Sequence, residues 1–362
     1  MLIKEIENLS GVDRANMGDK LPQVLHPWRR YLARAFDEVI YMIFWVTFLA
    51  FVFHVNVLDR NNAEKFLDGF ITTIMMLFLE PLLLHLFGTT PGKAIFGLRI
   101  ENPDGRRLSY IEGLERTWGV LSRGMGFNIP IYNIIRLLKS YNLCKENETQ
   151  PWDESISYTI KDTKWYRGVI YIGASLATFA VLFTISSAQQ LPPNKGDINV
   201  AEFVENHNYY AKLYKIDFSN EYLDEDGKWV EKETDKTIIY ISLNEKPEYN
   251  FTIENGYVTG VSFEIEMKNH DYMISSYDKH MFLASLAFAG AQNEMGLFSK
   301  IPKRIADNIA NNIFNDYNFV ENGITFDCDI EYSGYKKVAS ILVPSENVEE
   351  NYFSLKFSMN KE

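Results

Sequence analysis

The first half of the chain has the hydrophobic pattern of a membrane protein. Three long runs of apolar residues occur there, Val39–Leu58, Phe66–Phe87 and Gly168–Ala188, and the first and third contain no Asp, Glu, Lys or Arg. A helix needs about 20 mostly apolar residues to cross a bilayer. The pattern therefore predicts three membrane spans, over about residues 36–58, 66–87 and 167–188.

The segment Ser109–Leu143 is also apolar, but it is less regular. Glycines and a proline interrupt it, and four basic residues leave no uncharged window as long as a span: Arg116, Arg123, Arg136 and Lys139. Basic residues near both ends favour a cytoplasmic position for both. We interpret the segment as an interfacial or re-entrant pair of helices. The alternative is a fourth span.

Beyond about residue 200 the pattern changes to short runs typical of strands. We expect strands over residues 237–243, 249–253, 258–267, 324–332, 337–343 and 352–359, and helices over residues 276–295 and 301–314. The predicted fold class is a multi-pass α-helical membrane module followed by a soluble α+β domain. Its expected parts are an amino-terminal segment 1–25, the module 26–188, a linker 189–200 and the domain 201–362.

The two halves of the chain differ in charge. Up to Gln190 there are 20 Lys and Arg against 19 Asp and Glu, whereas the remainder has 16 against 29. An acidic domain repels phosphates, so nucleic acid is not expected as a partner. The cysteines, Cys144 and Cys328, lie one in each half and provide no disulfide framework.

The basic residues predict the orientation of the module. Six of them precede Asp37, two lie between the first and second runs, and four follow Gly88 as far as residue 107. Lys and Arg near the ends of spans favour the cytoplasmic side. We therefore expect a cytoplasmic amino terminus and, with three spans, an extracytoplasmic domain.

The loop after the second run carries the most specific motif of the sequence. Thr90-Pro91-Gly92-Lys93 leads into Gly97-Leu98-Arg99, and Asp104-Gly105 is typical of a tight turn. We predict a small hairpin around Asp104-Gly105. Gly92-Lys93 is not interpreted as a phosphate-binding loop, because the first glycine and the preceding strand of that motif are missing.

This motif, an arginine (Arg30) seven residues before Asp37, and a second aspartate, Asp153, together resemble the RDD family of bacterial membrane proteins. The resemblance covers about residues 25–187. It assigns these family-motif positions: Arg30, Asp37, Asp153, Thr90, Pro91, Gly92, Lys93, Gly97 and Arg99. Where the family often has His before the second aspartate, this chain has Trp152. The resemblance implies a multi-pass module in a bacterial cell membrane and, beyond that, only a link to ion transport.

Helical spacing places Arg30, Arg34 and Asp37 on one face of the entry helix. Asp37 is therefore expected to neutralise Arg34 or Arg30 where the helix enters the bilayer. A local charge clamp is one interpretation of these residues, and a functional relay is the other.

Glu80 lies inside an apolar run, directly before Pro81. An ionised carboxylate there costs roughly 2.5 to 3.5 kcal/mol unless it is paired or hydrated. We therefore hypothesise an intramembrane cluster with Glu80 as the group that binds a cation or proton; its other expected members are Asp37, His85 and either Arg116 or Arg123. The alternative is a Glu–Arg pair that only holds helices together.

The second half offers little catalytic chemistry. His270, Asp271, Asp278 and His280 have no metal-ligand spacing, and no nucleophile motif or phosphate cradle occurs. We expect neither an enzyme nor a bound cofactor or metal. The tyrosines of residues 209–214 are interpreted as packed aromatics or, alternatively, as a binding surface.

Two functions from different classes remain. The first is an anchor that holds the domain outside the cytoplasm for binding, sensing or assembly with a protein partner or a second copy of the chain. The second is an ion-coupled transporter that moves a small cation or proton through the Asp37 and Glu80 cluster. The lipid bilayer is an expected partner in both.

Overall fold

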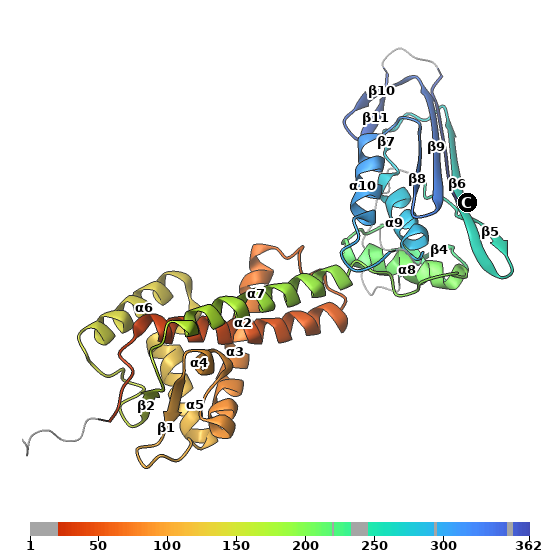
Figure 1. Cartoon of the computed structure of the whole chain (residues 1–362). Coiled ribbons are helices and arrows are strands. Elements are labelled where there is room, and N and C mark those ends of the chain that lie inside the picture. Colours follow the sequence, from red (N-terminus) through yellow and green to blue (C-terminus); the bar gives the residue numbers. More distant parts are fainter. Residues whose placement is uncertain (1–20, 219–220, 233–244, 293–294, 346–349) are drawn as a thin grey trace, which may run out of the picture. The chain divides into compact units, whose positions relative to one another are not determined.

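The computed structural model describes residues 21–218, 221–232, 245–292, 295–345 and 350–362. These residues form two compact units (Figure 1). Unit 1 comprises Met1–Phe48 and Arg60–Leu182, and unit 2 comprises Leu49–Asp59 and Phe183–Glu362. The last part of the first predicted span is thus grouped with the carboxy-terminal half of the chain.

Unit 1 is mainly helical. In chain order its described elements are α2 (Pro27–Phe51), α3 (Asn62–Phe87), α4 (Pro91–Ile95), β1 (Leu98–Glu101), α5 (Tyr110–Gly119), the π-helical turn η1 (Val120–Gly124), the 3₁₀ turn η2 (Gly126–Asn128), α6 (Pro130–Lys145), β2 (Ser157–Ile160) and α7 (Tyr166–Ala188). Both α2 and α7 continue at their carboxyl ends into unit 2.

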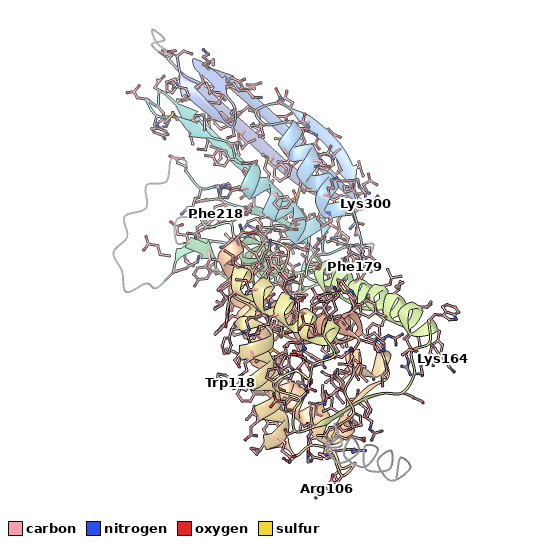
Figure 2. The ribbon with its side chains drawn as sticks, turned by 90° about the vertical axis from the view of Figure 1, so that its left-hand side faces the viewer. Arg106, Trp118, Lys164, Phe179, Phe218 and Lys300 are labelled. Carbon is pink, nitrogen blue, oxygen red and sulfur yellow. The ribbon has the colours of Figure 1, made fainter. Side chains whose placement is uncertain are left out.

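Two of these helices are long and apolar enough to cross a membrane, α3 and α7. Exposed apolar side chains cover both, among them Phe78 on α3 and Phe179 on α7; Figure 2 labels Phe179. An α-helix with so much exposed apolar surface needs an apolar environment. The second and third predicted spans therefore correspond to α3 and α7.

The first predicted span, residues 36–58, is longer than the helix that forms. Helix α2 ends at Phe51, and His54 has a left-handed backbone conformation with φ of 52°. The uncharged part of α2, Val39–Phe51, therefore has thirteen residues and is about 20 Å long. Helix α2 as a whole is not among the candidate spans, because Arg34, Asp37 and Glu38 precede this uncharged part.

The predicted hairpin after α4 does not form. The turn is present, since the Gly105 amide donates to the Asn102 carbonyl at 2.9 Å, but residues 106–108 form no strand. Strand β1 pairs instead with the distant β2, in an antiparallel register that joins Leu98 to Ile160. The Tyr158 amide also donates to the carbonyl of Pro22, just before α2. The chain before α2, after α3 and before α7 thus meets in one small sheet region.

The segment between residues 109 and 145 is divided into short pieces. Gly124 is needed at its break, because a Cβ there would lie 2.8 Å from the Trp152 ring. None of α5, η1, η2 and α6 has the length of a span. Helix α6 exposes apolar residues at helical spacing, Ile131, Ile134, Ile135 and Leu138. This is the pattern of a helix that lies along a membrane interface.

Unit 2 is an α+β domain around an antiparallel sheet. Its described elements are α8 (Val200–Leu213), β3 (Glu221–Leu223), β4 (Trp229–Glu231), β5 (Asn250–Glu254), β6 (Tyr257–Lys268), β7 (Ile274–Ser275), α9 (Asp278–Ala289), α10 (Ile301–Asn311), β8 (Tyr317–Glu321), β9 (Ile324–Ser333), β10 (Tyr335–Val338), β11 (Ile341–Pro344) and β12 (Tyr352–Lys361). The large sheet has the order β5-β6-β12-β9-β8.

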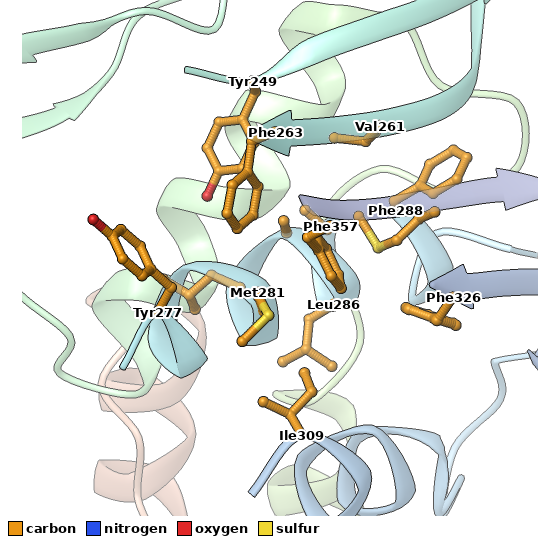
Figure 3. Close-up of a cluster of buried hydrophobic side chains, with 14 of the residues drawn as sticks. Tyr249, Val261, Phe263, Tyr277, Met281, Leu286, Phe288, Ile309, Phe326 and Phe357 are labelled. Atoms are coloured by element: carbon orange, nitrogen blue, oxygen red, sulfur yellow. The ribbon is translucent and has the colours of Figure 1, made fainter. Parts of the chain in front are cut away.

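The core of unit 2 lies between this sheet and its helices. Alternate residues of β6, β9 and β12 are buried, and Phe263, Phe326 and Phe357 pack against Met281, Leu286 and Phe288 of α9 (Figure 3). Helices α9 and α10 lie on the same side of the sheet (Figure 1). The outward positions carry charged side chains such as Lys268 and Glu264, as expected when one face of an antiparallel sheet is solvated.

Most predicted elements of this half are present in the structure. The strands expected at 249–253, 258–267, 324–332 and 352–359 correspond to β5, β6, β9 and β12, and both helices occur, with α9 shorter than expected. The strand expected at 337–343 is instead two short strands, β10 and β11, and the one at 237–243 lies outside the described residues. The sequence interpretation missed α8 and β8.

Residues 189–200 are not a free linker. Ile198 is fully buried, and its carbonyl accepts a hydrogen bond from the Val258 amide at 2.8 Å. The Tyr210 hydroxyl donates to the Gln190 carbonyl at 2.9 Å. Tyr210 is itself buried, so it is a packing residue and not part of a binding surface.

The loop after α2 and the end of α7 meet inside unit 2. The side-chain amide of Gln189 donates to the Val55 carbonyl at 2.7 Å and to the Ala50 carbonyl at 3.3 Å. Lys215 lies 3.3 Å from the Asp59 carboxylate. The carboxyl ends of α2 and α7 are therefore joined to the same domain.

Two histidines lie inside the aromatic part of this core. His207 of α8 and His280 of α9 both contact Trp229, with ring centres 5.9 and 5.5 Å away. Burial lowers the pKa of His207 to about 4. Burial, together with the nearby His207, lowers the pKa of His280 to about 3. Both rings are thus neutral in the folded domain at neutral pH.

We expect this pair to make unit 2 sensitive to acid. Below pH 6.5 the unfolded chain binds protons on these rings and the folded chain does not, so stability is full above that pH and falls as the pH decreases toward 4. Each histidine should remove about 2 kcal/mol of stability between pH 7.5 and 5. Unfolding of the full chain in detergent at both pH values measures this. His280→Phe should reduce the pH dependence, and an unchanged dependence would contradict the assignment.

Candidate functional site, a buried cluster of ion pairs

Seven charged side chains meet inside unit 1. Three carboxylates, Asp37, Glu80 and Asp153, contact four cations, Arg30, Arg34, Lys93 and Arg116. They come from α2, α3, α4, α5 and the loop before β2. We call this group the charge cluster. Its carboxylates are at most 1% exposed, so each needs partners that replace water.

Glu80 is the centre of the charge cluster. One of its oxygens lies 2.9 Å from the Lys93 Nζ and 3.1 Å from an Arg116 nitrogen, and Arg34 follows at 3.7 Å. These three cations belong to three different helices, α4, α5 and α2. Glu80, which lies in the apolar run of α3, is therefore ionised and paired. Its contacts join four helices.

Asp37 binds the start of α4. Its two oxygens accept hydrogen bonds from the Gly92 amide at 2.7 Å and from the Thr90 hydroxyl, and Lys93 lies 3.6 Å away. A carboxylate at a helix amino terminus satisfies free amides and is favoured by the helix dipole. Gly92 is required at this contact, since a Cβ there would lie 1.9 Å from the Ala33 carbonyl oxygen of α2.

Asp153 completes the charge cluster from the loop before β2. It pairs with the Nε of Arg116 at 3.0 Å and with Arg30. The Arg30 guanidinium also lies over the Tyr158 ring, 4.6 Å from its centre. Burial acts to raise the pKa of Asp153, but the Arg116 and Arg30 guanidiniums outweigh it and hold that pKa below its usual value.

Lys93 is the one lysine of the charge cluster. Burial lowers its pKa, while the Glu80 and Asp37 carboxylates oppose this effect. The Nζ also lies 3.2 Å from the Thr90 hydroxyl oxygen. A lysine with two carboxylates and a hydroxyl around it has a partner for each of its three protons.

The structure brings together only part of the hypothesised ion site. Asp37, Glu80 and Arg116 meet as expected. His85 does not join them, because its Nδ1 lies 3.0 Å from the Leu108 carbonyl. Arg123 is exposed and forms no ion pair in the described part of the chain, so Arg116 is the arginine of that segment that pairs with Glu80.

The expected ion pair of Asp37 with Arg34 or Arg30 within α2 is not present in the described structure. Asp37 forms no ion pair with Arg30 or Arg34 in the described structure, since its oxygens turn to α4. Arg30 pairs instead with Asp153, 123 residues along the chain. Arg30, Arg34 and Asp37 thus lie on one helix but form their contacts with different neighbouring segments.

The remaining family-motif positions lie around the charge cluster. Pro91 occupies the first turn of α4. Gly97 has a left-handed backbone conformation and lies against the Arg167 guanidinium, where a Cβ would be only 2.6 Å away. Arg99 is half-exposed and pairs with Glu101 at 2.5 Å, outside the cluster.

The ion-site hypothesis did not include four members of the charge cluster, Arg30, Arg34, Lys93 and Asp153. Lys93 and Asp153 were motif positions, but no helical spacing relates them to Glu80. The number of carboxylates could have indicated Lys93. Two buried carboxylates, Glu80 and Asp37, need more than one cation, and Lys93 follows the end of α3 by only six residues.

Comparison with known proteins covers the same region. A family model described as the RDD family matches residues 24–191. No curated protein and no solved structure matches the chain.

We expect Arg116→Gln to destabilise unit 1 strongly. The change removes a partner from both Glu80 and Asp153, and breaking a buried ion pair by removing one member costs about 3 to 5 kcal/mol. The matched control is Arg106→Gln, an exposed arginine paired with Asp104, which should change little. Thermal unfolding of the full chain in detergent compares the two. Equal melting temperatures would contradict a structural role for the charge cluster.

Proposed function

Residues 24–191 of this chain belong to the RDD family, and we propose that this region is a membrane anchor that holds the acidic domain of residues 201–362 outside the cytoplasm. The domain would act there by binding a protein partner or a second copy of the chain. In this proposal α2, α3 and α7 each cross the bilayer, and α5 to α6 remain at the cytoplasmic interface.

The proposal rests on the contacts between the ends of α2, α3 and α7. Strand β1 after α3 pairs with β2 before α7, and β2 also bonds the chain before α2. The opposite ends of α2 and α7 are joined through Gln189 and the loop around Val55. This arrangement supports the proposed topology, in which α2 and α7 run parallel and α3 runs antiparallel to them.

Basic residues support the orientation. The end with the small sheet carries Arg99, Arg106, Lys161 and Lys164, the last of which Figure 2 labels at the start of α7. The turn before α3 has Arg60, which pairs with Asp68 at 2.9 Å. The larger number of Lys and Arg residues at the sheet end favours its retention in the cytoplasm.

The charge cluster favours an anchor over an ion pathway. Asp37, Glu80 and Asp153 each contact one or more cations within 4 Å. A cation that binds there must first displace Lys93 or an arginine from a buried carboxylate, and leaving such a charge unpaired is costly. We therefore propose that the cluster holds the module together and conducts no ion.

Cysteine labelling in intact cells tests the side of the domain. In a chain with Cys144→Ser and Cys328→Ser, a single Asp226→Cys places a thiol in an exposed turn of unit 2. We expect a membrane-impermeant maleimide to label it before lysis. The matched control, Asp104→Cys, lies in the exposed turn of unit 1 and should react only after lysis. Labelling of Asp226→Cys only after lysis would refute the proposed topology.

Transport is tested separately in liposomes. The purified chain is reconstituted with an internal pH-sensitive dye, and sodium or potassium is added outside. We expect the internal pH to change no faster than in protein-free liposomes, because each cluster carboxylate is already paired. Faster, cation-dependent proton movement that Glu80→Gln abolishes would instead establish the transporter.

A further inference from the structure

A cavity of about 510 Å³ lies beside the charge cluster in unit 1. Residues of the start of α2, of η1 and of α6 line it, together with Trp152. Its volume is in the range of sites that bind small molecules. We call it the α2–α6 pocket.

The walls of the α2–α6 pocket are mostly apolar. Val120, Met125, Leu137 and Cys144 line its interior. Trp28, Tyr31 and Tyr141 line it as well and are exposed, and both tyrosine rings lie 6.3 Å from the Trp28 ring. Amphipathic aromatic residues are typical of the level of lipid headgroups.

The α2–α6 pocket opens where apolar side chains are exposed. Ile134 and Leu138 of α6 line the pocket and are each 59% exposed. They belong to the apolar face of α6 that is suited to a membrane interface. An apolar chain from the bilayer therefore reaches the pocket without crossing a polar surface.

The polar part of the pocket is cationic. Arg30, Arg34 and Arg116 all line it, together with Gln150 and Ser140, and no carboxylate does. Arg30 and Arg116 form close pairs with Asp153 and Glu80. Arg34 differs, because its nearest carboxylate, Glu80, is 3.7 Å away and its hydrogen bond goes to the Met125 sulfur at 3.5 Å.

Arg34 makes the longest contact among the four cations of the charge cluster. Lys93, Arg116 and Arg30 make the short contacts to its three carboxylates, whereas Arg34 reaches Glu80 only at 3.7 Å. Glu38, one turn further along α2, lies close enough for the Arg34 charge to act on it, but it forms no ion pair within 4 Å in the described structure. A second anion placed in the pocket would give Arg34 the charge-assisted hydrogen bonds that Glu80 does not supply.

We propose that the α2–α6 pocket binds an anionic membrane lipid. One acyl chain occupies the apolar interior, the aromatic residues surround the chain at the pocket opening, and the headgroup phosphate accepts hydrogen bonds from Arg34. The inference requires residues 24–191 to lie in a membrane, and it does not depend on which side the acidic domain occupies. A peptide is disfavoured as occupant because the pocket offers few polar groups for a peptide backbone.

Native mass spectrometry of the delipidated full chain tests this. The probes are phosphatidylglycerol and phosphatidylcholine with the same short acyl chains. The wild-type chain should bind one phosphatidylglycerol about tenfold more tightly than phosphatidylcholine. Arg34→Gln should lose this headgroup preference, and Leu137→Trp, which fills the apolar interior, should bind both lipids weakly. The matched control Arg106→Gln changes an exposed arginine that does not line the pocket, and it should bind like the wild type.

Three results would overturn the proposal. Equal affinity of the wild-type chain for both lipids would mean that lipids bind only nonspecifically to the apolar surface. Equal losses in Arg34→Gln and Arg106→Gln would indicate general electrostatic attraction. Competition by glycerol phosphate at the lipid's own affinity would identify a site for a water-soluble phosphate. Thermal unfolding shows whether Leu137→Trp folds. If it does not, the comparison of Arg34→Gln with Arg106→Gln tests the proposal.

Discussion

The structure of the membrane module depends on the burial of three carboxylates close to one another. Each carboxylate taken out of water costs several kcal/mol unless cations and hydrogen-bond donors replace the solvent. Asp37, Glu80 and Asp153 obtain these partners from three separate helices, α2, α4 and α5. Because no single helix can supply them all, the charges are satisfied only when those elements are assembled.

This constraint explains several local features of the chain. Gly92 lets α4 approach the α2 backbone, so that the Gly92 amide reaches Asp37 and Lys93 reaches Glu80. Arg116, one turn from the end of α5, bridges Glu80 and Asp153 and thereby fixes α5 against α3 and the later loop. The pairing of β1 with β2 then closes the same end of the module. Buried ion pairs of this kind specify an arrangement more than they stabilise it.

Much of the organisation was predictable from local pattern, because span length, strand alternation and turn residues act over a few positions. Runs of apolar residues located α3 and α7, and Asn255-Gly256 located the turn between β5 and β6. The expectation that Glu80 needs an arginine, and that Arg116 is a candidate, followed from the cost of a buried charge. The contact between Glu80 and Arg116 is therefore the part of the site that residue chemistry predicted.

The remaining contacts join residues that no local rule relates. Asp104-Gly105 favours a hairpin, yet β1 pairs with a strand almost 60 residues later, because the Tyr158 and Ile100 side chains are both buried in that arrangement. Asp37 was assigned to its own helix and binds α4 instead. Pro192-Pro193 suggested a linker by composition, although Ile198 a few residues on is part of the domain core.

A double-mutant cycle on Glu80 and Lys93 tests most directly whether the buried pairs hold the module together. The free energy of unfolding in mixed micelles is measured for the wild type, Glu80→Gln, Lys93→Met and the double variant. Each single change takes from a buried charge one of its partners, whereas the double change removes both charges. We predict that the double variant is more stable than the sum of the single losses allows, by about 2 to 3 kcal/mol. Losses that add to within about 0.5 kcal/mol would show that the two side chains act independently and would contradict the account.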